Sequence, residues 1–263
     1  MLELRKIGVL LRDAPEEYPL EEMSQVLGGH GVELAVLSWP DPPPADLDLI
    51  MAMGGDGTVL KALDLYPCCP VLAVNYGTVG FLTAADRTDL QRIIALLVAG
   101  RYLVSERLVL DCRHPGGAAR AVNEVIVRTA NRLIHTDVFV NDTKIRTIRG
   151  DGVVVGTPTG STGFLLSAGA PIVMPDVRCM ILDGVNEYNF TSRTLVLTPE
   201  SRIRLHISPE TREPNIFLTV DGQQLGQVHP GDEICVARSE TAAKLIYFEP
   251  NYFFHNLSSR LSW

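Results

Sequence analysis

The first hundred residues alternate short apolar runs with segments whose apolar side chains recur at helical spacing. The apolar runs occupy residues 6–11, 32–39, 49–53 and 70–76. The helical spacing occupies residues 16–31, 58–66 and 88–100. Short apolar runs suit buried strands, and the segments between them suit helices. The alternation predicts an N-terminal doubly wound parallel α/β domain.

From about Tyr102 onward, the apolar positions fall in short β-branched segments separated by turn residues. This pattern predicts a C-terminal antiparallel, sandwich-like β domain, with one helical turn expected in residues 160–173. The tail from residue 244 mixes aromatic residues and leucines, and we expect it to return to the first domain as a short helix. The expected parts are an α/β domain at 1–100, a β-rich domain at 101–240 and a C-terminal segment at 241–263.

Composition and charge narrow the classes of function. The chain has 263 residues, 46% apolar residues and a formal net charge of −8. Without a block of lysine and arginine, this charge argues against nucleic acid and anionic membrane surfaces as partners, because both are polyanions. The early acidic residues disfavour a signal peptide. Five scattered cysteines fit a reducing compartment, so we expect a cytoplasmic protein that acts on small molecules.

The stretch GGDGT, residues 54–58, lies where an apolar run meets a helical segment. Backbone N–H groups at such a junction bind phosphate, and glycines let the phosphate approach closely. The stretch lacks the Lys-Ser/Thr ending of a P-loop and the GxGxxG spacing of dinucleotide-binding folds. A carboxylate such as Asp56 beside phosphates either holds Mg²⁺ or accepts the proton of an attacking hydroxyl. The alternative is a glycine-rich turn in which Asp56 caps the helix.

Four further segments add polar residues at turns. They are NYGTVGFLT at 75–83, Asn123-Glu124, the glycine-rich segment at 149–173 and VDGQQ at 220–224. In this order, with GGDGT before them, they resemble the NAD kinases over essentially the whole chain. That family phosphorylates the 2′-hydroxyl of the adenosine ribose of NAD to give NADP.

The resemblance implies that ATP or inorganic polyphosphate is the phosphoryl donor and that Mg²⁺ or another divalent cation is the cofactor. It assigns no protein side chain as a metal ligand. Family members are usually dimers or tetramers in which a neighbouring subunit supplies part of the nucleotide site. We therefore expect a homodimer or homotetramer.

The resemblance also assigns roles to individual residues. Asp56 would face the ribose 2′-hydroxyl as base or orienting acceptor, and Gly54, Gly55, Gly57 and Thr58 would cradle the donor phosphates. Lys61 would meet a pyrophosphate, although a solvated helix lysine is an equal alternative. The remaining nucleotide-binding positions that it implies are Asn75, Phe81, Asn123, Glu124, Arg149, Asp151, Thr159, Ser161, Thr162, Phe164, Ser167 and Gln223.

Side-chain chemistry is consistent with these roles but leaves alternatives open. Asn123 offers a donor and an acceptor to an adenine edge, and Glu124 offers acceptors to ribose hydroxyls; alone, the pair fits a surface turn. The hydroxyls of residues 159–162 fit either nucleoside edges or a hydrogen-bonded turn. Asp221-Gly222, just before Gln223, fits a hairpin turn.

Two departures from the family pattern stand out. Phe164 occupies a position where the family commonly has tyrosine, which keeps a stacking face but loses a hydroxyl. Residues 180–197 replace a stretch that is rich in proline, cysteine and histidine in many bacterial members. The resemblance therefore assigns no contact to Asp183–Thr191, which could alter subunit packing or the nicotinamide side of the pocket.

Two rival functions fit parts of the pattern. Lipid kinases of the diacylglycerol or sphingosine type share a GGDGT-like loop, but in them an Asn-Glu pair usually follows almost at once. Here Val59-Leu60-Lys61 follows, and the Asn-Glu pair comes much later. A catalytically silent NAD-binding regulator is the other alternative, and the intact Asp56 argues against it.

Overall fold

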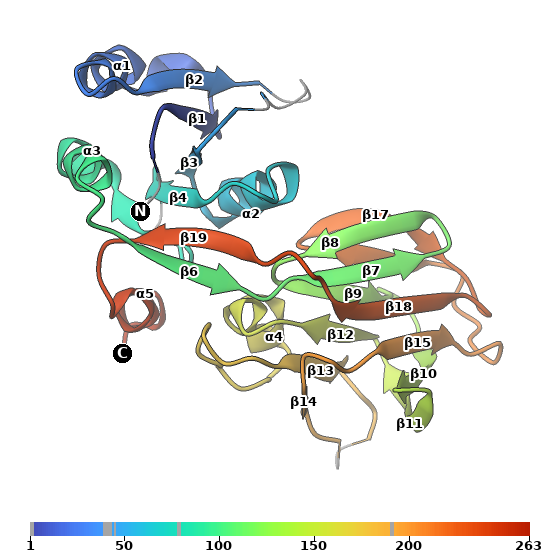
Figure 1. Cartoon of the computed structure of the whole chain (residues 1–263). Coiled ribbons are helices and arrows are strands. Elements are labelled where there is room, and N and C mark those ends of the chain that lie inside the picture. The colour runs from blue at the N-terminus through green and yellow to red at the C-terminus, as the bar shows by residue number, and fades with distance from the viewer. Residues whose placement is uncertain (1–2, 39–43, 45, 78–79, 190–191) are drawn as a thin grey trace. The chain divides into compact units, whose positions relative to one another are not determined.

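A computed structural model of the chain describes residues 3–38, 44, 46–77, 80–189 and 192–263. The chain divides into one unit made of residues 1–106 and 243–263 and a second made of residues 107–242 (Figure 1). Each unit has its own hydrophobic core. Outside the described residues lie Thr78 and Val79 of the NYGTVGFLT motif. Also outside lie Phe190 and Thr191 of residues 183–191, which we call the atypical segment because they depart from the family pattern.

A seven-stranded sheet forms the centre of the first unit, in the order β2-β1-β3-β4-β19-β6 with β5 beside β4. Its strands are β1 (Lys6–Leu11), β2 (Glu33–Leu37), β3 (Leu49–Gly54), β4 (Val71–Asn75), β5 (Ala85–Asp86), β6 (Leu103–Arg107) and β19 (Ala243–Tyr247). Strands β2, β1, β3 and β4 pair in parallel, which confirms the predicted parallel sheet.

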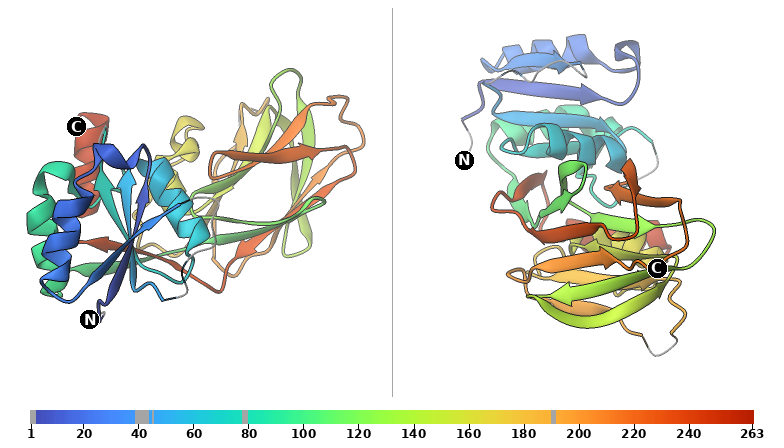
Figure 2. Two further views of the ribbon diagram at one scale, coloured as in Figure 1. Left: turned by 90° about the horizontal axis from the view of Figure 1, so that it is seen from above. Right: turned by 90° about the vertical axis from the view of Figure 1, so that its right-hand side faces the viewer.

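Helices lie on both faces of this sheet, as in a doubly wound fold. They are α1 (Leu20–Gly28), α2 (Asp56–Leu65), α3 (Leu90–Val98) and α5 (Tyr252–Leu261), with short 3₁₀ turns η1 (Pro15–Glu17) and η2 (Arg87–Asp89). Figure 2 shows α1 and α3 on one face and α2 on the other. Helix α3 buries Leu90, Ile93, Ile94 and Leu97, the spacing that predicted it. No helix within the described ranges is long and apolar enough to cross a membrane.

The end of the chain contributes a strand as well as the expected helix. Strand β19 pairs in parallel with β4, so that Leu245 lies opposite Val71 and Ile246 opposite Leu72. Leu245, Ile246 and Tyr247 are all fully buried. The apolar run at residues 245–248 is typical of a strand covered on both faces, but the aromatic residues of α5 follow it closely, so the tail as a whole shows only mixed spacing. Strand β6, in the segment expected to be β-rich, lies beside β19.

Two antiparallel sheets of six strands make up the second unit. The first contains β7 (Leu110–His114), β8 (Gly117–Ala121), β10 (Ile134–Val140), β11 (Thr143–Gly150), β15 (Ile203–Ile207) and β18 (Glu233–Arg238). The second contains β9 (Glu124–Arg128), β12 (Gly152–Gly156), β13 (Met180–Val185), β14 (Leu195–Leu197), β16 (Ile216–Val220) and β17 (Gln223–Val228). One apolar cluster joins them, with Val138 and Leu205 from one sheet and Val127 and Val155 from the other. The predicted sandwich-like β domain is confirmed.

The helical turn expected in residues 160–173 covers the outer face of the second sheet. It consists of the 3₁₀ turn η3 (Thr159–Thr162) and the short helix α4 (Phe164–Ser167). Leu165 packs there against Ile126 and Val154. Because β9 and β12 are covered on both faces, residues at their ends are held in a buried setting.

Candidate active site

The residues that the sequence predicts for the site form two groups, one in each unit. The first unit holds Gly54, Gly55, Asp56, Gly57, Thr58, Lys61, Asn75 and Phe81. The second unit holds Asn123, Glu124, Arg149, Asp151, Thr159, Ser161, Thr162, Phe164, Ser167 and Gln223.

Asp56 is the first residue of α2, directly after the turn that follows β3. Its carboxylate accepts the backbone N–H of Phe81 at 2.9 Å and that of Leu82 at 3.1 Å. The N-cap of α2 is Gly55, and no side-chain hydrogen bond caps the helix. Asp56 therefore does not act as a helix cap; it binds the loop that follows β4.

Glycines leave room for this arrangement. A Cβ atom built on Gly80 would lie 1.9 Å from Oδ1 of Asp56, so only glycine lets the carboxylate reach the loop. A Cβ on Gly54 would lie 2.2 Å from Oγ1 of Thr58, which is buried beneath the turn. Around Gly55 and Gly57 there is open space instead. That space adjoins the first turn of α2, where the Thr58 N–H donates to Gly55 O at 2.9 Å. The leading N–H groups of a helix attract anions, because most of them lack intrahelical partners.

The other predicted residues of the first unit differ in setting. Lys61 is exposed on α2. Asn75 is buried, and its side chain holds the turn after β4: Oδ1 accepts the Gly77 N–H, and Nδ2 donates to Gly77 O at 3.1 Å and to Asp86 at 3.3 Å. Asn75 thus shapes the start of the loop whose later part holds Asp56.

Asp221 organises the corresponding group in the second unit. Its carboxylate accepts the backbone N–H groups of Val122, Asn123 and Glu124 at 2.7, 2.8 and 3.0 Å. Asp221 and Gly222 have φ angles of 46° and 80°, which confirms the predicted hairpin turn between β16 and β17. Sequence reasoning found this turn but missed that its acid fixes the Asn-Glu pair, because the motif gives no direction for the carboxylate.

Glu124 is a buried acid with a perturbed pKa. Burial and the neighbouring Asp221 carboxylate raise its pKa to about 7, and a hydrogen bond from the Phe164 backbone opposes the rise. Within the described part of the chain, Oε2 of Glu124 and Oδ1 of Asn123 are buried without a hydrogen-bond partner. Buried polar atoms in proteins are nearly always paired, so these two acceptors indicate a place for the donors of a ligand.

The turn after β12 packs directly against the Asn-Glu pair. Thr157 donates its hydroxyl to Val122 O, and a Cβ on Gly160 would lie 2.2 Å from Asn123 O. A Cβ on Gly163 would lie 3.1 Å from Oε2 of Glu124, so the missing side chain leaves space beside that orphan oxygen. Gly160 therefore lets the turn approach the Asn123 backbone closely, and Gly163 leaves space beside Oε2 of Glu124.

The hydroxyl residues of this turn differ in burial and in their hydrogen-bond partners. Ser161 is fully buried, and its Oγ donates to Pro158 O at 2.7 Å and accepts the Val173 N–H at 3.0 Å. Thr162 donates to Thr159 O at 3.1 Å but keeps part of its surface open. Thr159 is buried and accepts a hydrogen bond from Arg107 at 3.2 Å. The hydrogen-bonded turn thus describes Ser161 best.

The atypical segment makes contacts that the sequence did not predict. Asn186 donates to Asp151 at 2.8 Å, and the Tyr188 N–H donates to Arg149 O at 2.7 Å. Glu187 lies 3.5 Å from Arg146. Residues 186–188 therefore hold the region before β12. Among the other predicted residues, Phe164 is half-buried, and Arg149, Ser167 and Gln223 are exposed.

Two sequence models of one protein family match the chain. The ATP-NAD kinase N-terminal domain matches residues 41–102, and the ATP-NAD kinase C-terminal domain matches residues 122–248. An NAD kinase of Clostridium perfringens is 31% identical over 223 residues, which cover 82% of this chain and 80% of that protein.

Two solved structures share the fold. A crystal structure of an NAD kinase from Archaeoglobus fulgidus in complex with ATP is 26% identical, covers 98% of this chain and 99% of that chain, and has a TM-score of 0.83. A crystal structure of yeast NADH kinase complexed with NADH is 23% identical, covers 99% of this chain and 88% of that chain, and has a TM-score of 0.87. The likeness confirms the predicted combination of a parallel α/β sheet and antiparallel β sheets.

Glu124→Gln should flatten the dependence of stability on pH. The folded protein binds the Glu124 proton more tightly than the unfolded chain, since the pKa rises from 4.5 to about 7. Stability is therefore lost as pH rises through this window, and the substitution, which has no proton to lose, removes this loss. In urea unfolding, the difference in free energy of unfolding, variant minus wild type, should rise by about 2 kcal/mol between pH 5 and pH 8.

The exposed Glu240 provides the control. Glu240→Gln should show the same pH dependence as wild type, because its carboxyl is solvated in both states. Parallel curves for Glu124→Gln and wild type would show that burial does not perturb the Glu124 carboxyl.

Proposed function

The chain belongs to the ATP-NAD kinase family, and from that premise we propose that it transfers the γ-phosphoryl group of ATP to the 2′-hydroxyl of the adenosine ribose of NAD, which gives NADP. Inorganic polyphosphate is a second proposed donor. The observation that carries the proposal is the Asp56 carboxylate, held by two backbone N–H groups beside open space at Gly55 and Gly57. The enzyme is thus a phosphotransferase that acts on an alcohol group.

Asp56 has the geometry of an acceptor for the attacking hydroxyl. A carboxylate has about four acceptor positions, and the N–H groups of Phe81 and Leu82 use two of them. Phosphoryl transfer passes through a loose transition state, so positioning and charge neutralisation contribute most of the rate. Asp56 would orient the 2′-hydroxyl and accept its proton late, while Gly54, Gly55, Gly57, Thr58 and the first turn of α2 cradle the donor phosphates.

Asn123 and Glu124 would recognise the adenosine part of NAD. Their orphan oxygens can accept hydrogen bonds from an adenine amino group and from ribose hydroxyls. With its pKa near 7, Glu124 would become more ionised when hydroxyl donors bind, because such hydrogen bonds favour the carboxylate. Phe164 would stack on a base. The residues Lys61, Asn75, Phe81, Arg149, Asp151, Thr159, Ser161, Thr162, Ser167 and Gln223 complete the proposed nucleotide site, directly or by shaping its loops.

Mg²⁺ or another divalent cation is the proposed cofactor. In kinases, Mg²⁺ is held mainly by substrate phosphates with one or two carboxylates, and when bound it neutralises phosphate charge. Asp56 supplies a carboxylate at the phosphate-binding turn, so the residues present fit such a cation. Among the residues that the structure describes, no three His, Cys, Asp or Glu side chains gather into a metal cluster.

We also propose that the protein acts in the cytoplasm as a homodimer or homotetramer. All five cysteines are free thiols, which suits a reducing compartment. The oligomeric state is supported by the family resemblance, and light scattering of the purified protein would measure it.

Purified protein with Mg²⁺ should phosphorylate a dinucleotide. ATP and polyphosphate are supplied in separate reactions, and NAD, NADH and diacylglycerol are offered one at a time. NADP formation from NAD is the expected result. Phosphorylation of the lipid alone would overturn the proposal in favour of a lipid kinase, and NAD binding without phosphorylation would favour a silent regulator.

Asp56→Asn should lower kcat by about 10²- to 10⁴-fold while the dissociation constant for NAD changes little, because the variant loses the proton acceptor. Calorimetric titration with NAD and steady-state kinetics separate the two effects. Near-normal turnover would remove Asp56 from the chemistry.

Gly80→Ala should leave the protein folded but displace the Asp56 carboxylate, since the new Cβ would lie 1.9 Å from its Oδ1. Relieving this contact requires the carboxylate to move by about 1 Å, and a misplacement of about 1 Å costs about 10²-fold in kcat. Gly28→Ala, in α1 with no atom within 4 Å of the added Cβ, is the matched control and should keep wild-type kinetics. Equal kcat values for the two variants would contradict the proposed placement of Asp56.

A further inference from the structure

The loop that holds Asp56 is itself held by the C-terminal part of the chain. The N–H groups of Phe81 and Leu82 donate to Asp56, and the carbonyl groups of the same loop accept hydrogen bonds from β19 and α5. Nδ2 of Asn256 donates to Phe81 O at 3.1 Å and to Thr83 O at 2.9 Å. The Tyr247 hydroxyl donates to Leu82 O at 3.2 Å.

Both donors come from well-anchored elements. Helix α5 buries Phe253 and Leu257, so its face toward the unit is fixed and Asn256 lies on that side. Tyr247 is fully buried, and its ring stacks on Tyr252 with the centroids 3.4 Å apart and the planes inclined by 10°. Anchored donors of this kind can hold a loop in one position.

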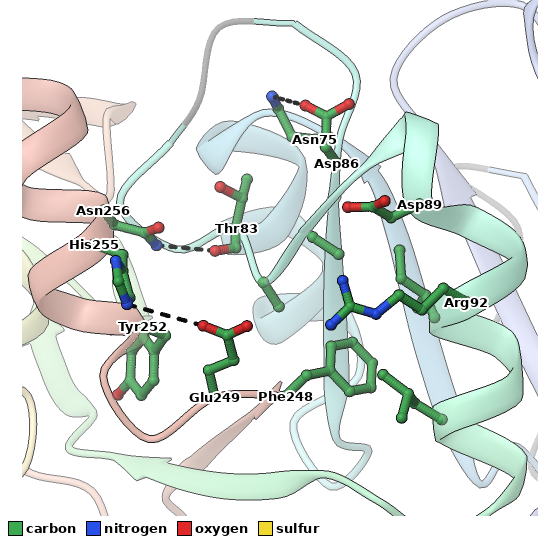
Figure 3. A pocket seen from close by; sticks show the side chains of 14 residues that line it. Asn75, Thr83, Asp86, Asp89, Arg92, Phe248, Glu249, Tyr252, His255 and Asn256 are labelled. Atoms are coloured by element: carbon green, nitrogen blue, oxygen red, sulfur yellow. Dashed lines mark hydrogen bonds and ion pairs between the residues drawn. The ribbon is translucent and has the colours of Figure 1, made fainter.

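Hydrogen bonds matter here because a cavity adjoins one end of the loop, although the Leu82 and Thr83 side chains are themselves buried. A cavity of about 270 Å³ lies between α3 and α5, and Figure 3 shows Thr83 and Asn256 at its edge, joined by their hydrogen bond. Next to open space, the loop backbone can shift unless polar contacts fix it. The two bonds from Asn256 reach the residues on either side of Leu82, whose N–H binds Asp56.

We propose that Asn256 is a positioning residue for phosphoryl transfer. It fixes residues 81–83, which in turn aim the Asp56 carboxylate at the acceptor hydroxyl, and Tyr247 gives a second support. This inference rests on the proposed NAD kinase activity. A reacting group displaced by about 1 Å can cost 10²-fold in rate, so the effect of Asn256 should be measurable.

Asn256→Asp is the most direct test, because it keeps the shape of the side chain. It replaces the donating nitrogen with an oxygen that faces two carbonyl oxygens, so the loop is released or pushed away. The kcat for NAD phosphorylation should fall about 10- to 100-fold. The KM values for NAD and ATP should change less than kcat, because the Asn256 side chain contacts neither substrate and acts mainly through the orientation of Asp56.

A double-mutant cycle separates positioning from general support of the fold. In an Asp56→Ala background, the group that Asn256 positions is gone, so Asn256→Asp should change the residual rate by less than about twofold. The same fold-loss in both backgrounds would mean a merely structural role and would overturn the inference. An unchanged kcat in the single variant would overturn it too.

Two further variants complete the design. Ser259→Ala changes an exposed residue of α5 and should keep wild-type kinetics. Tyr247→Phe removes only the donor to Leu82 O and keeps the ring stack, so it should show a smaller loss of kcat, again only when Asp56 is present. If Asn256→Asp fails to fold by circular dichroism, the cycle with Tyr247→Phe decides. A wild-type protein that does not phosphorylate NAD would refute the activity itself, which separates that failure from failure of the inference.

Discussion

The hydrogen bonds from two backbone N–H groups to the Asp56 carboxylate are the constraint on which the first unit's site depends. They join residues that are 25 and 26 positions apart in the chain, in the segments that follow the neighbouring parallel strands β3 and β4. The bonds set the orientation of a short side chain at the start of α2. They also explain why glycine occurs at position 80, where any Cβ would collide with the acid.

In the second unit, too, a carboxylate accepts several backbone N–H groups, but there it fixes the Asn-Glu pair. There Asp221 accepts three successive N–H groups and fixes the backbone from Val122 to Glu124. Its charge has a second effect, since it adds to burial in raising the pKa of Glu124. In each unit a carboxylate therefore organises backbone, and in the second it also leaves a neighbouring acid close to the point of ionisation at neutral pH.

Local patterns predicted much of this structure. The GGDGT stretch identified the β3–α2 junction, and the alternation of apolar runs and helical segments predicted the parallel sheet. Contacts over long separations were outside the reach of such patterns. Nothing near Gly80 shows that it faces Asp56, and nothing near Asn256 shows that it binds residues 81 and 83. The sequence did not predict strand β19 because the aromatic residues of α5 follow its short apolar run closely, and the two together give a mixed pattern.

Strand β19 has a further consequence for how the protein is made. During synthesis, residues 1–106 emerge before the second unit, but the strand that lies between β4 and β6 emerges only after it. Until then the sheet lacks an interior strand, and the loop beside Asp56 lacks Tyr247 and Asn256. A chain that stops before residue 243 therefore carries the GGDGT turn without the support of its neighbouring loop, so assembly of this site depends on the synthesis of residues 243–263.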